Sequence, residues 1–457
     1  MYNGMIHRKE EMKRFVIIGY GSLAQGLTPL LRKHYPEYEI SVITADTGGY
    51  IIANEYGVKH QVKPLTPDNY RLILPLVTSA GDIMLNLSVN VSSLALIEWC
   101  QEQGVTYLDT CVEPWDGGYV KRSVKESTNH HLREEALKLR KPNTPTAVIA
   151  HGANPGLVSY FVKEGLKNLT KDRGLTHSEN YGEMARDLGI QTIQIAERDT
   201  QDMSIQDAGD LFINTWSVCG LMSEAAQFSE MSLGTHENYI PDSVIIQENA
   251  IGRSAMLADY GHSTFVKSWV PSGGPQIAYL ITHHEAFSIA DFLTTPETPG
   301  NKEYRPSVYY AYRPNDHTVS CLQKMSSDHR YNQQTVQKMI MVDEIDTGFD
   351  ELGVLFCYKG GAYWYGSHLT IDETRELAPY NNATTLQVNA TILGAIRWIE
   401  ENPMRGVVEA EEVDYDTVMD IALPYLGTVR GVHTRWSPSE DSLNLTHSVF
   451  ISCAVMD

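Results

Sequence analysis

The sequence lacks the features that mark a secreted, metal-binding or membrane-spanning protein. Its 457 residues include only six cysteines, and no two of them form a C-x-x-C pair, so neither a disulfide framework nor a zinc site is expected. No stretch approaches the roughly 20 consecutive apolar residues of a membrane span. The polar N-terminus, residues 1–14, has no apolar core of a signal peptide. We therefore expect a cytoplasmic protein with no metal ion and no membrane partner.

Positive charge is also scarce. The chain has 36 Lys and Arg residues against 57 Asp and Glu residues, which gives a formal net charge of −21. Nucleic acids and anionic membrane surfaces are bound through clustered positive charge, so we expect neither as a partner. The acidic balance is compatible with a cationic small molecule, although a large acidic surface also serves simply to keep an enzyme soluble.

What is present is an ordinary globular composition in a chain too long for one domain. Hydrophobic residues make up 42% of the chain and charged residues 20%, which argues against disorder. In the first third, short apolar runs alternate with amphipathic stretches, and this alternation predicts an α/β fold with a Rossmann-type, doubly wound parallel sheet. The expected strands cover 15–18, 40–44, 83–89, 106–112 and 146–150, and the expected helices cover 23–34, 92–103 and 130–141.

The sequence pattern changes twice in the rest of the chain. Residues from about 155 to 375 are richer in Tyr, Trp, Gly and Pro, which favours a second α/β domain with a mixed sheet. A helical pattern returns over 385–399. We therefore divide the chain into a dinucleotide-binding domain (1–154), a substrate and dimerisation domain (155–380), and a helical C-terminal segment (381–457) that packs back on the first domain.

A glycine-rich turn follows the first predicted strand. Gly19, Gly21 and Ala24 form a G-x-G-x-x-A pattern: Gly19 permits the tight turn, Gly21 lets a pyrophosphate approach the backbone, and Ala24 lets the helix pack on the strand. Ser22 and Leu23 open that helix, whose free N–H groups suit phosphate. Because this turn lies between a strand and a helix, it predicts dinucleotide binding rather than a merely tight turn.

The ends of the next strands supply further candidates for the cofactor site. Thr44 stands where an acidic residue is expected to bind the ribose, and Asp46 follows two residues later. Because residues 44–50 contain no Arg or Lys, NAD is favoured over NADP. Ligands of such sheets bind at the carboxyl ends of the strands, where the sequence also places Asn86, Leu87, Asp109 and Thr110.

Acidic and amide side chains follow the later strands. Glu113 comes directly after a strand and faces the cofactor crevice, although a solvated loop position is the ordinary alternative. Asn154 precedes Pro155, which suits a first helical turn. Asn154 is therefore expected to cap that helix, or alternatively to hold a substrate amine with its amide oxygen.

Three more glutamates and a tryptophan are candidates for an acidic cavity. Trp216 can offer its ring face to an ammonium group. Taken singly, however, each Glu is more often at the surface and each Trp more often in the core. His283 and His284 are adjacent, so in a strand they would point to opposite faces, and their spacing does not suit a metal site. The three glutamates are Glu197, Glu224 and Glu285.

Taken together, these segments resemble the bacterial homospermidine synthases, and the resemblance runs nearly from end to end. These enzymes are related in architecture to saccharopine dehydrogenase-like proteins, which implies a Rossmann domain and a second α/β domain that shapes the active site and a homodimer contact. The segments that carry the resemblance are Gly19-Tyr-Gly-Ser22, Asn86-Leu-Ser-Val89, Leu108-Asp-Thr-Cys-Val-Glu-Pro-Trp115, Gly152-Ala-Asn-Pro-Gly156, Ile195-Ala-Glu-Arg-Asp-Thr200, Asn214-Thr-Trp-Ser217, Thr282-His-His-Glu285, Ser288-Ile-Ala-Asp-Phe-Leu293, Asp350-Glu-Leu-Gly353 and Ala362-Tyr-Trp-Tyr-Gly366.

The resemblance implies a transferase that uses NAD as a prosthetic group. In the family reaction, two putrescines condense to homospermidine through imine intermediates and ammonia is released. Spermidine can replace one putrescine as the aminobutyl donor, with release of diaminopropane. Hydride moves from the substrate to NAD⁺ and back within one cycle, so there is no net oxidation.

The resemblance also implies roles for the candidate residues. Glu113 and Glu197 match acidic residues that hold or deprotonate amines, whereas Asn154 and Glu285 match groups that anchor the other amine end. Trp216 matches the residue that stabilises cationic intermediates. Glu224 and His283 match further pocket residues, and the general base remains open among Glu197, Glu113 and His283. The chain departs from the family at Thr44 and at His284, which stands beside the pocket glutamate.

Two other functions are compatible with parts of the sequence. The first is a dehydrogenase with net redox, of the carboxynorspermidine or saccharopine dehydrogenase type. Its substrates carry carboxylates and would require an Arg or Lys clamp, whereas Arg198 is the only basic residue among the candidate pocket segments. The second is a catalytically silent NAD-binding sensor, against which the density of acid, amide and Trp residues argues.

Overall fold

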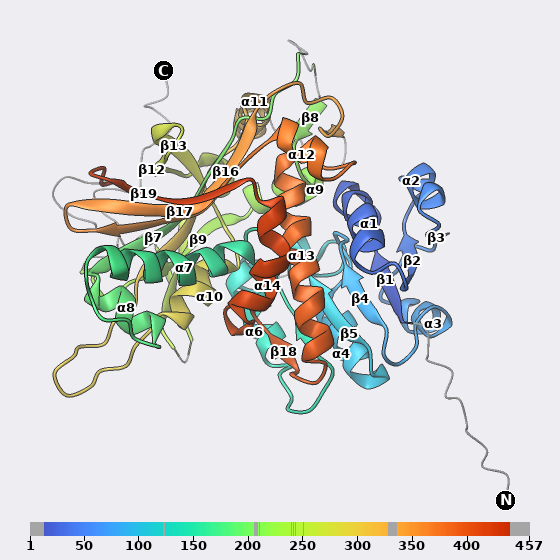
Figure 1. Cartoon of the computed structure of the whole chain (residues 1–457), viewed down its shortest axis with the longest axis horizontal. Coiled ribbons are helices and arrows are strands. Elements are labelled where there is room, and N and C mark those ends of the chain that lie inside the picture. The colour runs from blue at the N-terminus through green and yellow to red at the C-terminus, as the bar shows by residue number, and fades with distance from the viewer. Residues whose placement is uncertain are drawn as a thin grey trace, which may run out of the picture.

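Two sheets of different construction form the framework of the molecule (Figure 1). The structure is a computed structural model that describes residues 13–121, 124–204, 209, 211–238, 240, 242, 244–249, 251–327 and 336–438. The first sheet has seven parallel strands in the order β18-β6-β5-β4-β1-β2-β3. They are β1 (Arg14–Ile18), β2 (Glu39–Thr44), β3 (Lys59–Val62), β4 (Ile83–Asn86), β5 (Thr106–Asp109), β6 (Ala147–Val148) and β18 (Val407–Val408).

The second sheet has ten strands and is mixed. Strand β14 pairs parallel with β7, whereas β16 pairs antiparallel with the other side of β7. The prediction of an α/β protein with a parallel Rossmann-type sheet and a second, mixed sheet is thereby confirmed. The ten strands are β7 (Ile190–Asp199), β9 (Phe228–Leu233), β10 (Ile245–Glu248), β11 (Arg253–Tyr260), β12 (Phe265–Val270), β13 (Gly274–Ile281), β14 (Ser307–Arg313), β16 (Phe349–Tyr358), β17 (Gly361–Thr370) and β19 (Thr428–Thr434).

Buried apolar residues explain why the strands of the first sheet form where they do. In β1, Phe15, Val16, Ile17 and Ile18 are all buried, as expected for a central parallel strand covered on both faces. Strands β4 and β5 end at Asn86 and Asp109, earlier than the sequence pattern predicts. The residues beyond them turn away at the carboxyl edge instead of extending the sheet.

Helices join the two sheets at the centre of the molecule. The helix predicted over 385–399 is α13 (Ala383–Glu401), and it packs against α1 (Ser22–His34), α14 (Tyr415–Ala422) and strand β16. Figure 1 shows α13 and α14 between the first sheet and the second. The chain beyond residue 381 also contributes a strand to each sheet, β18 to the first and β19 to the second.

The remaining helices surround this framework. Helix α4 is capped by Ser92 and ends at Gly104 in a left-handed conformation, as the sequence predicts. No helix of the described residues is long and apolar enough to cross a bilayer. The helices are α2 (Tyr50–Glu55), α3 (Tyr70–Ile73), α4 (Ser93–Gln103), α5 (Gly118–Lys121), α6 (Asn129–Leu137), α7 (Leu157–Asp172), α8 (Tyr181–Asp187), α9 (Val218–Ala225), α10 (Glu285–Phe292), α11 (Asp316–Ser327) and α12 (Ile371–Leu377), and a short pair of strands, β8 (Leu211–Asn214) and β15 (Gln337–Ile340), lies beside them.

Candidate active site

The glycine turn between β1 and α1 leaves room for a ligand. Gly19 has φ of +86°, and a Cβ on it would lie 2.8 Å from the backbone of Ser88, so only glycine fits there. A Cβ on Gly21, in contrast, would meet nothing within 4 Å. The backbone at Gly21 is therefore open to an approaching group, as the dinucleotide motif requires.

A cleft of about 520 Å³ adjoins this turn. Ser22 and Gln25 of α1 line it from one side, and Ser217, which caps α9, lines it from the other side together with Lys338. The cleft therefore lies between the glycine turn and the segment that carries Trp216, as a dinucleotide that must meet a second substrate requires.

The other predicted cofactor residues lie at the carboxyl edge of the first sheet with different degrees of exposure. Thr44 ends β2 and is buried, whereas Asp46 is exposed and accepts a hydrogen bond from the backbone N–H of Gly48. The Asn86 carboxamide oxygen accepts a hydrogen bond from the Ser88 hydroxyl at 2.7 Å. Leu87 and Thr110 are half-buried next to these strand ends.

Asp109 is fully buried at the end of β5. Its two carboxylate oxygens accept hydrogen bonds from the Ala150 N–H at 2.6 Å and the Tyr107 hydroxyl at 2.8 Å. Burial raises the pKa of Asp109 to about 6. The Asp109 side chain thus ties the end of β5 to Ala150, just beyond β6, and the Asp109 carbonyl accepts a further hydrogen bond from the His151 N–H at 2.8 Å.

Glu197 lies in β7 and is almost completely buried. One of its oxygens accepts hydrogen bonds from the Tyr310 hydroxyl at 2.6 Å and from the Asn154 amide at 3.2 Å. Burial raises the pKa of Glu197 to about 8, and the negative charge of Asp199 adds to the effect. Such a carboxyl group is mostly protonated at neutral pH, and its carboxylate form is a stronger base toward an amine than an ordinary carboxylate is.

Two further carboxylates of the cluster were not predicted as site residues. Asp199 and Asp350 face one another across the paired strands β7 and β16, and Asp199 lies two residues from Glu197 on the same face. Burial, followed by the charges of Glu197 and Asp199, raises the pKa of Asp350. In the sequence, Asp350 stands out only as part of a motif. The local sequence pattern does not predict that its strand, β16, pairs with β7.

His283 bridges two other glutamates. Its Nδ1 lies 3.1 Å from a Glu285 oxygen and its Nε2 lies 3.3 Å from a Glu224 oxygen. Burial opposes a charge on His283, but the two carboxylates outweigh burial and raise the pKa of His283 to about 10. The two carboxylates therefore favour the protonated form of His283.

Glu113 approaches the same region from the first sheet. It is buried after β5, and one carboxylate oxygen lies 3.4 Å from the Asn90 backbone N–H. Burial raises the pKa of Glu113 to about 7, and the charge of Glu224 adds to the rise. The structure thus brings Glu113 of the first sheet within electrostatic reach of Glu224, on α9.

Trp216 is held at the edge of this cluster by an aromatic pair. Its indole N–H donates to the Tyr312 hydroxyl at 3.2 Å. The ring of Tyr312 stacks on Tyr310, with centroids 5.4 Å apart, and Tyr310 in turn packs on His283 at 4.3 Å. The indole is only partly buried, so part of its surface is open to a ligand.

Two predictions about local structure are wrong. Asn154 does not cap a helix, because α7 begins at Leu157 with Gly156 at the cap position; the Asn154 side chain reaches Glu197 instead. His283 and His284 are not in a strand, because β13 ends at Ile281. They have separate partners nonetheless, since His284 bonds Glu409 at 2.7 Å.

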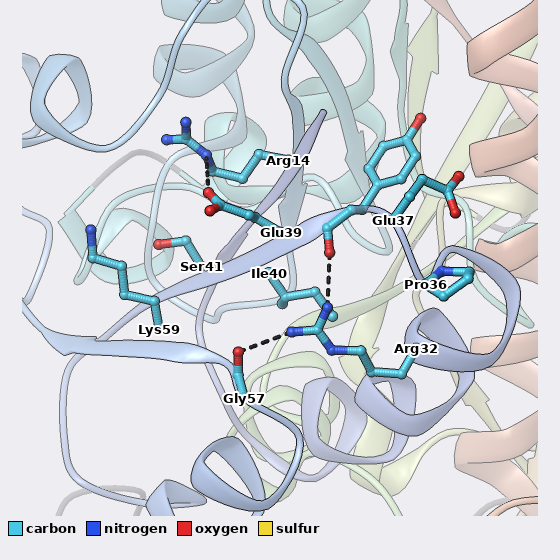
Figure 2. Close-up of a pocket in the computed structure, with 10 residues that line it drawn as sticks. Arg14, Arg32, Pro36, Glu37, Glu39, Ile40, Ser41, Gly57 and Lys59 are labelled. Carbon is cyan, nitrogen blue, oxygen red and sulfur yellow. Dashed lines mark hydrogen bonds and ion pairs between the residues drawn. The ribbon is translucent and has the colours of Figure 1, made fainter. Parts of the chain in front are cut away.

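A second pocket lies at the opposite edge of the first sheet (Figure 2). It is lined by the first residues of β2 and β3 and has a volume of about 350 Å³. Arg32 donates to backbone carbonyls, among them those of Tyr38 and Gly57, while Arg14 pairs with Glu39. Both arginines thus have partners within the protein, Lys59 adds a further cation to the lining, and the pocket lies at the amino ends of strands, where open α/β sheets do not bind their ligands.

The comparisons with known proteins agree with this arrangement. The family models described as saccharopine dehydrogenase NADP binding domain and saccharopine dehydrogenase C-terminal domain match residues 15–149 and 152–433. A homospermidine synthase from Blastochloris viridis is 42% identical over 439 residues, which cover 93% of this chain and 91% of that protein. The chain belongs to the homospermidine synthase family.

Further homospermidine synthases support the assignment. The enzyme from Mesorhizobium japonicum is 40% identical over 93% of this chain and 90% of its own. The crystal structure of the Legionella pneumophila homospermidine synthase in complex with NAD has a TM-score of 0.85 and 38% identity, and the match covers 95% of this chain and 94% of that one. The resemblance that the sequence motifs indicate is thereby confirmed.

Proposed function

We propose that this protein is a homospermidine synthase that condenses two putrescines, or spermidine and putrescine, and releases ammonia or diaminopropane. One observation carries the proposal: buried carboxylates from both sheets, with the half-buried Glu224, converge beside a partly open indole. A diamine substrate is a dication, and carboxylates offset the free-energy cost of removing its water. The carboxylates are Glu113, Glu197, Asp199, Glu224, Glu285 and Asp350.

The absence of a carboxylate clamp argues against a dehydrogenase of the saccharopine type. Arg198 is the one basic residue in the candidate pocket segments, and it follows Glu197 in β7, so its side chain lies on the other face of the sheet. Its guanidinium lies near Gly273. A substrate carboxylate in the glutamate cluster would be repelled by the glutamates, and the His283 imidazole there is already held between Glu224 and Glu285.

NAD fits the glycine turn as the cofactor of this reaction. The open space at Gly21 is the cradle that a Cβ would fill, and Ser22 and Leu23 begin the helix that would face the phosphates. Asp46, with Thr44 beside it, is placed to hold the ribose, and Asn86, Leu87, Thr110 and the backbone at Asp109 would line the remaining edge. When bound, NAD supplies the hydride acceptor and donor, so one molecule serves a whole cycle.

The pocket residues have separate roles in substrate binding and in proton transfer. Glu197 and Glu113, whose pKa values burial raises to about 8 and about 7, can take the proton that an amine must lose before hydride leaves its carbon. Asn154 keeps its amide oxygen for an amine while its N–H group holds Glu197. Glu285 and Glu224 anchor the other ammonium group, with His283 fixed between them.

Trp216 is assigned to the cationic intermediates. An indole face attracts a cation without attacking it, whereas a carboxylate or thiol close to an iminium carbon could trap it. The Tyr312 hydroxyl fixes the edge of the indole through Nε1, so the ring face keeps one orientation during the cycle.

The proposal extends to the setting in which the protein works. We expect a cytoplasmic homodimer with polyamine substrates and no nucleic-acid or membrane partner. Residues 1–154 would form the cofactor-binding part and 155–380 the substrate and dimerisation part, while the C-terminal segment packs on both, with β18 in the first sheet and β19 in the second.

The decisive experiment is an incubation of the pure protein with putrescine and a trace of NAD⁺. Formation of homospermidine and ammonia, in amounts far above the NAD⁺ added, supports the proposal. Accumulation of NADH equal to the substrate consumed, without homospermidine, would identify a dehydrogenase instead. Absence of any turnover, with NAD⁺ still bound, would identify a sensor. An incubation without NAD⁺ is the matched control.

A further inference from the structure

One face of helix α6 supports the segment that carries His283 and Glu285. At the start of α6, the Asn129 amide donates to the Thr282 hydroxyl at 3.1 Å. The ring of His130 meets the edge of Phe287 on α10, with centroids 5.2 Å apart. Helix α6 precedes β6 of the first sheet, so these contacts join the cofactor-binding part of the chain to residues 282–287.

Arg133 is the centre of this contact. Its guanidinium donates to both oxygens of Glu409, at 2.7 and 2.9 Å, and to Asp291 at 2.6 Å. The Arg133 side chain is 3% exposed, Asp291 is 6% exposed and Glu409 is 9% exposed. A planar guanidinium is needed to join two carboxylates in this way, because an ammonium group lacks the fork of donors.

The two carboxylates fix helix α10 at both ends. Glu409 accepts a hydrogen bond from His284, which immediately precedes α10, and Asp291 lies in its last turn. Asp291 also binds Arg305 at 2.6 Å. With Arg133 and Arg305 opposite Glu409 and Asp291, the four side chains balance in charge, so the burial of each charge is compensated.

We infer that Arg133, with Glu409 and His284, is a positioning unit that sets the place of Glu285 and His283 relative to the cofactor-binding sheet. None of the three is assigned to substrate or cofactor. Glu285 is the first residue of α10 and His283 is two residues before it, so a shift of the helix moves both. This inference rests on the proposed function and deepens it, because it explains how the anchor for the remote amine is aligned with the hydride acceptor.

The test compares Arg133→Lys with Arg71→Lys. Arg71 makes the same two-oxygen contact with Glu102, at 2.7 and 3.2 Å, but both side chains are about half exposed. Arg133→Lys is expected to raise the KM for putrescine by about tenfold or more and to leave the Kd for NAD⁺ within about twofold, because misplacement of a binding group by an ångström has effects of this size. Arg71→Lys is expected to change neither.

Two variants of His284 decide the matter if Arg133→Lys does not fold. His284→Gln keeps an N–H donor for Glu409 and is expected to retain the wild-type KM for putrescine, whereas His284→Leu removes it and is expected to raise that KM. The inference is overturned if Arg133→Lys behaves as Arg71→Lys does, if it weakens NAD⁺ and putrescine equally, or if the two His284 variants do not differ. Homospermidine formation by the wild type tests the proposed function separately, since every variant is compared with that value.

Discussion

Glu197 lies beside Asp199 on β7 and opposite the strand that carries Asp350, and three buried carboxyl groups so close together cannot all be charged in the free enzyme. Hydrogen bonds from Tyr310, Thr215 and other hydroxyls stabilise part of the charge, but the pKa of Glu197 still rises to about 8. On the proposed function, a bound ammonium group would supply the missing positive charge, and the substrate would bind with a change of protonation.

The first prediction concerns Glu197→Gln and pH. If Glu197 is the base, kcat/KM of the wild type rises as pH rises through about 8, because the carboxylate form then accumulates. The variant should lose this rise and most of its activity. Initial rates of homospermidine formation between pH 6 and about 10 provide the measurement.

The control for this prediction is Glu113→Gln. Persistence of the rise in Glu197→Gln, together with its loss in Glu113→Gln, would assign the base to Glu113. Stability gives a second readout: the native protein keeps the Glu197 proton between about pH 4.5 and 8, where the unfolded chain releases it. The free energy of unfolding therefore falls as pH rises through this range, and Glu197→Gln should reduce that fall.

The second prediction concerns the ring face of Trp216. Trp216→Ala should lower kcat by about 30-fold, since a desolvated cation–π contact contributes roughly 2 kcal/mol. Trp216→Phe should retain more activity, because a ring face remains. The Kd for NAD⁺ should change little in either variant, and Trp436→Phe, in the apolar cluster of β16 and β17, serves as the control. Equal loss of turnover and NAD⁺ binding in Trp216→Ala would contradict the cation–π role.

At this scale, the sequence reveals residues that stand in distinctive local motifs and misses those that tertiary pairing brings in. Glu197 and Trp216 are predicted because their neighbours are distinctive. Asp350 and Tyr312 reach the site only because β16 and β14 flank β7, and this pairing joins segments more than 100 residues apart in the chain. The role of Asn154 is predicted wrongly for a similar reason, because its amide donates a hydrogen bond to Glu197 on β7 of the second sheet.

At the scale of elements, two glycines of the turn between β1 and α1 are expected to have separate roles, Gly19 in folding and Gly21 in cofactor binding. Gly19→Ala should lower the free energy of unfolding by roughly 1–3 kcal/mol, because a Cβ there combines a positive φ with a backbone clash. Gly21→Ala should fold normally, since its Cβ meets no protein atom, yet bind NAD⁺ at least about tenfold more weakly. Thermal unfolding and NAD⁺ titration of both variants provide the measurements.

The opposite result for Gly21→Ala would indicate that the cofactor binds elsewhere. If Gly21→Ala binds NAD⁺ as the wild type does, the pyrophosphate does not approach this turn. The turn itself is predictable from sequence because every contact that defines it is local. The ends of strands are less predictable. The sequence pattern extends β4 to residue 89, but the chain turns after Asn86. The Asn86 amide N–H donates a hydrogen bond to the Tyr107 hydroxyl, and its oxygen accepts one from the Ser88 hydroxyl.

At the scale of the whole molecule, the net charge of −21 should assist the approach of a polycation. We expect kcat/KM for putrescine to fall as NaCl is raised, because the screening length shortens to about 8 Å at 0.15 M salt. The value of kcat at saturating putrescine should stay nearly constant, since salt screens buried charges much less than exposed ones. A kcat/KM that is independent of salt would show that the surface charge has no part in substrate capture.

Strand β18 can join the first sheet only late in the synthesis of the chain. It pairs with β6, although about 260 residues separate the two strands in the chain. At a translation rate of 5–20 residues per second, the edge strand leaves the ribosome roughly 13–50 s after its partner. The sheet that holds the glycine turn is thus completed only after almost all of the second sheet has emerged. A nascent chain stalled before residue 407 would leave the β6 edge bare, and such chains should be the ones that molecular chaperones retain.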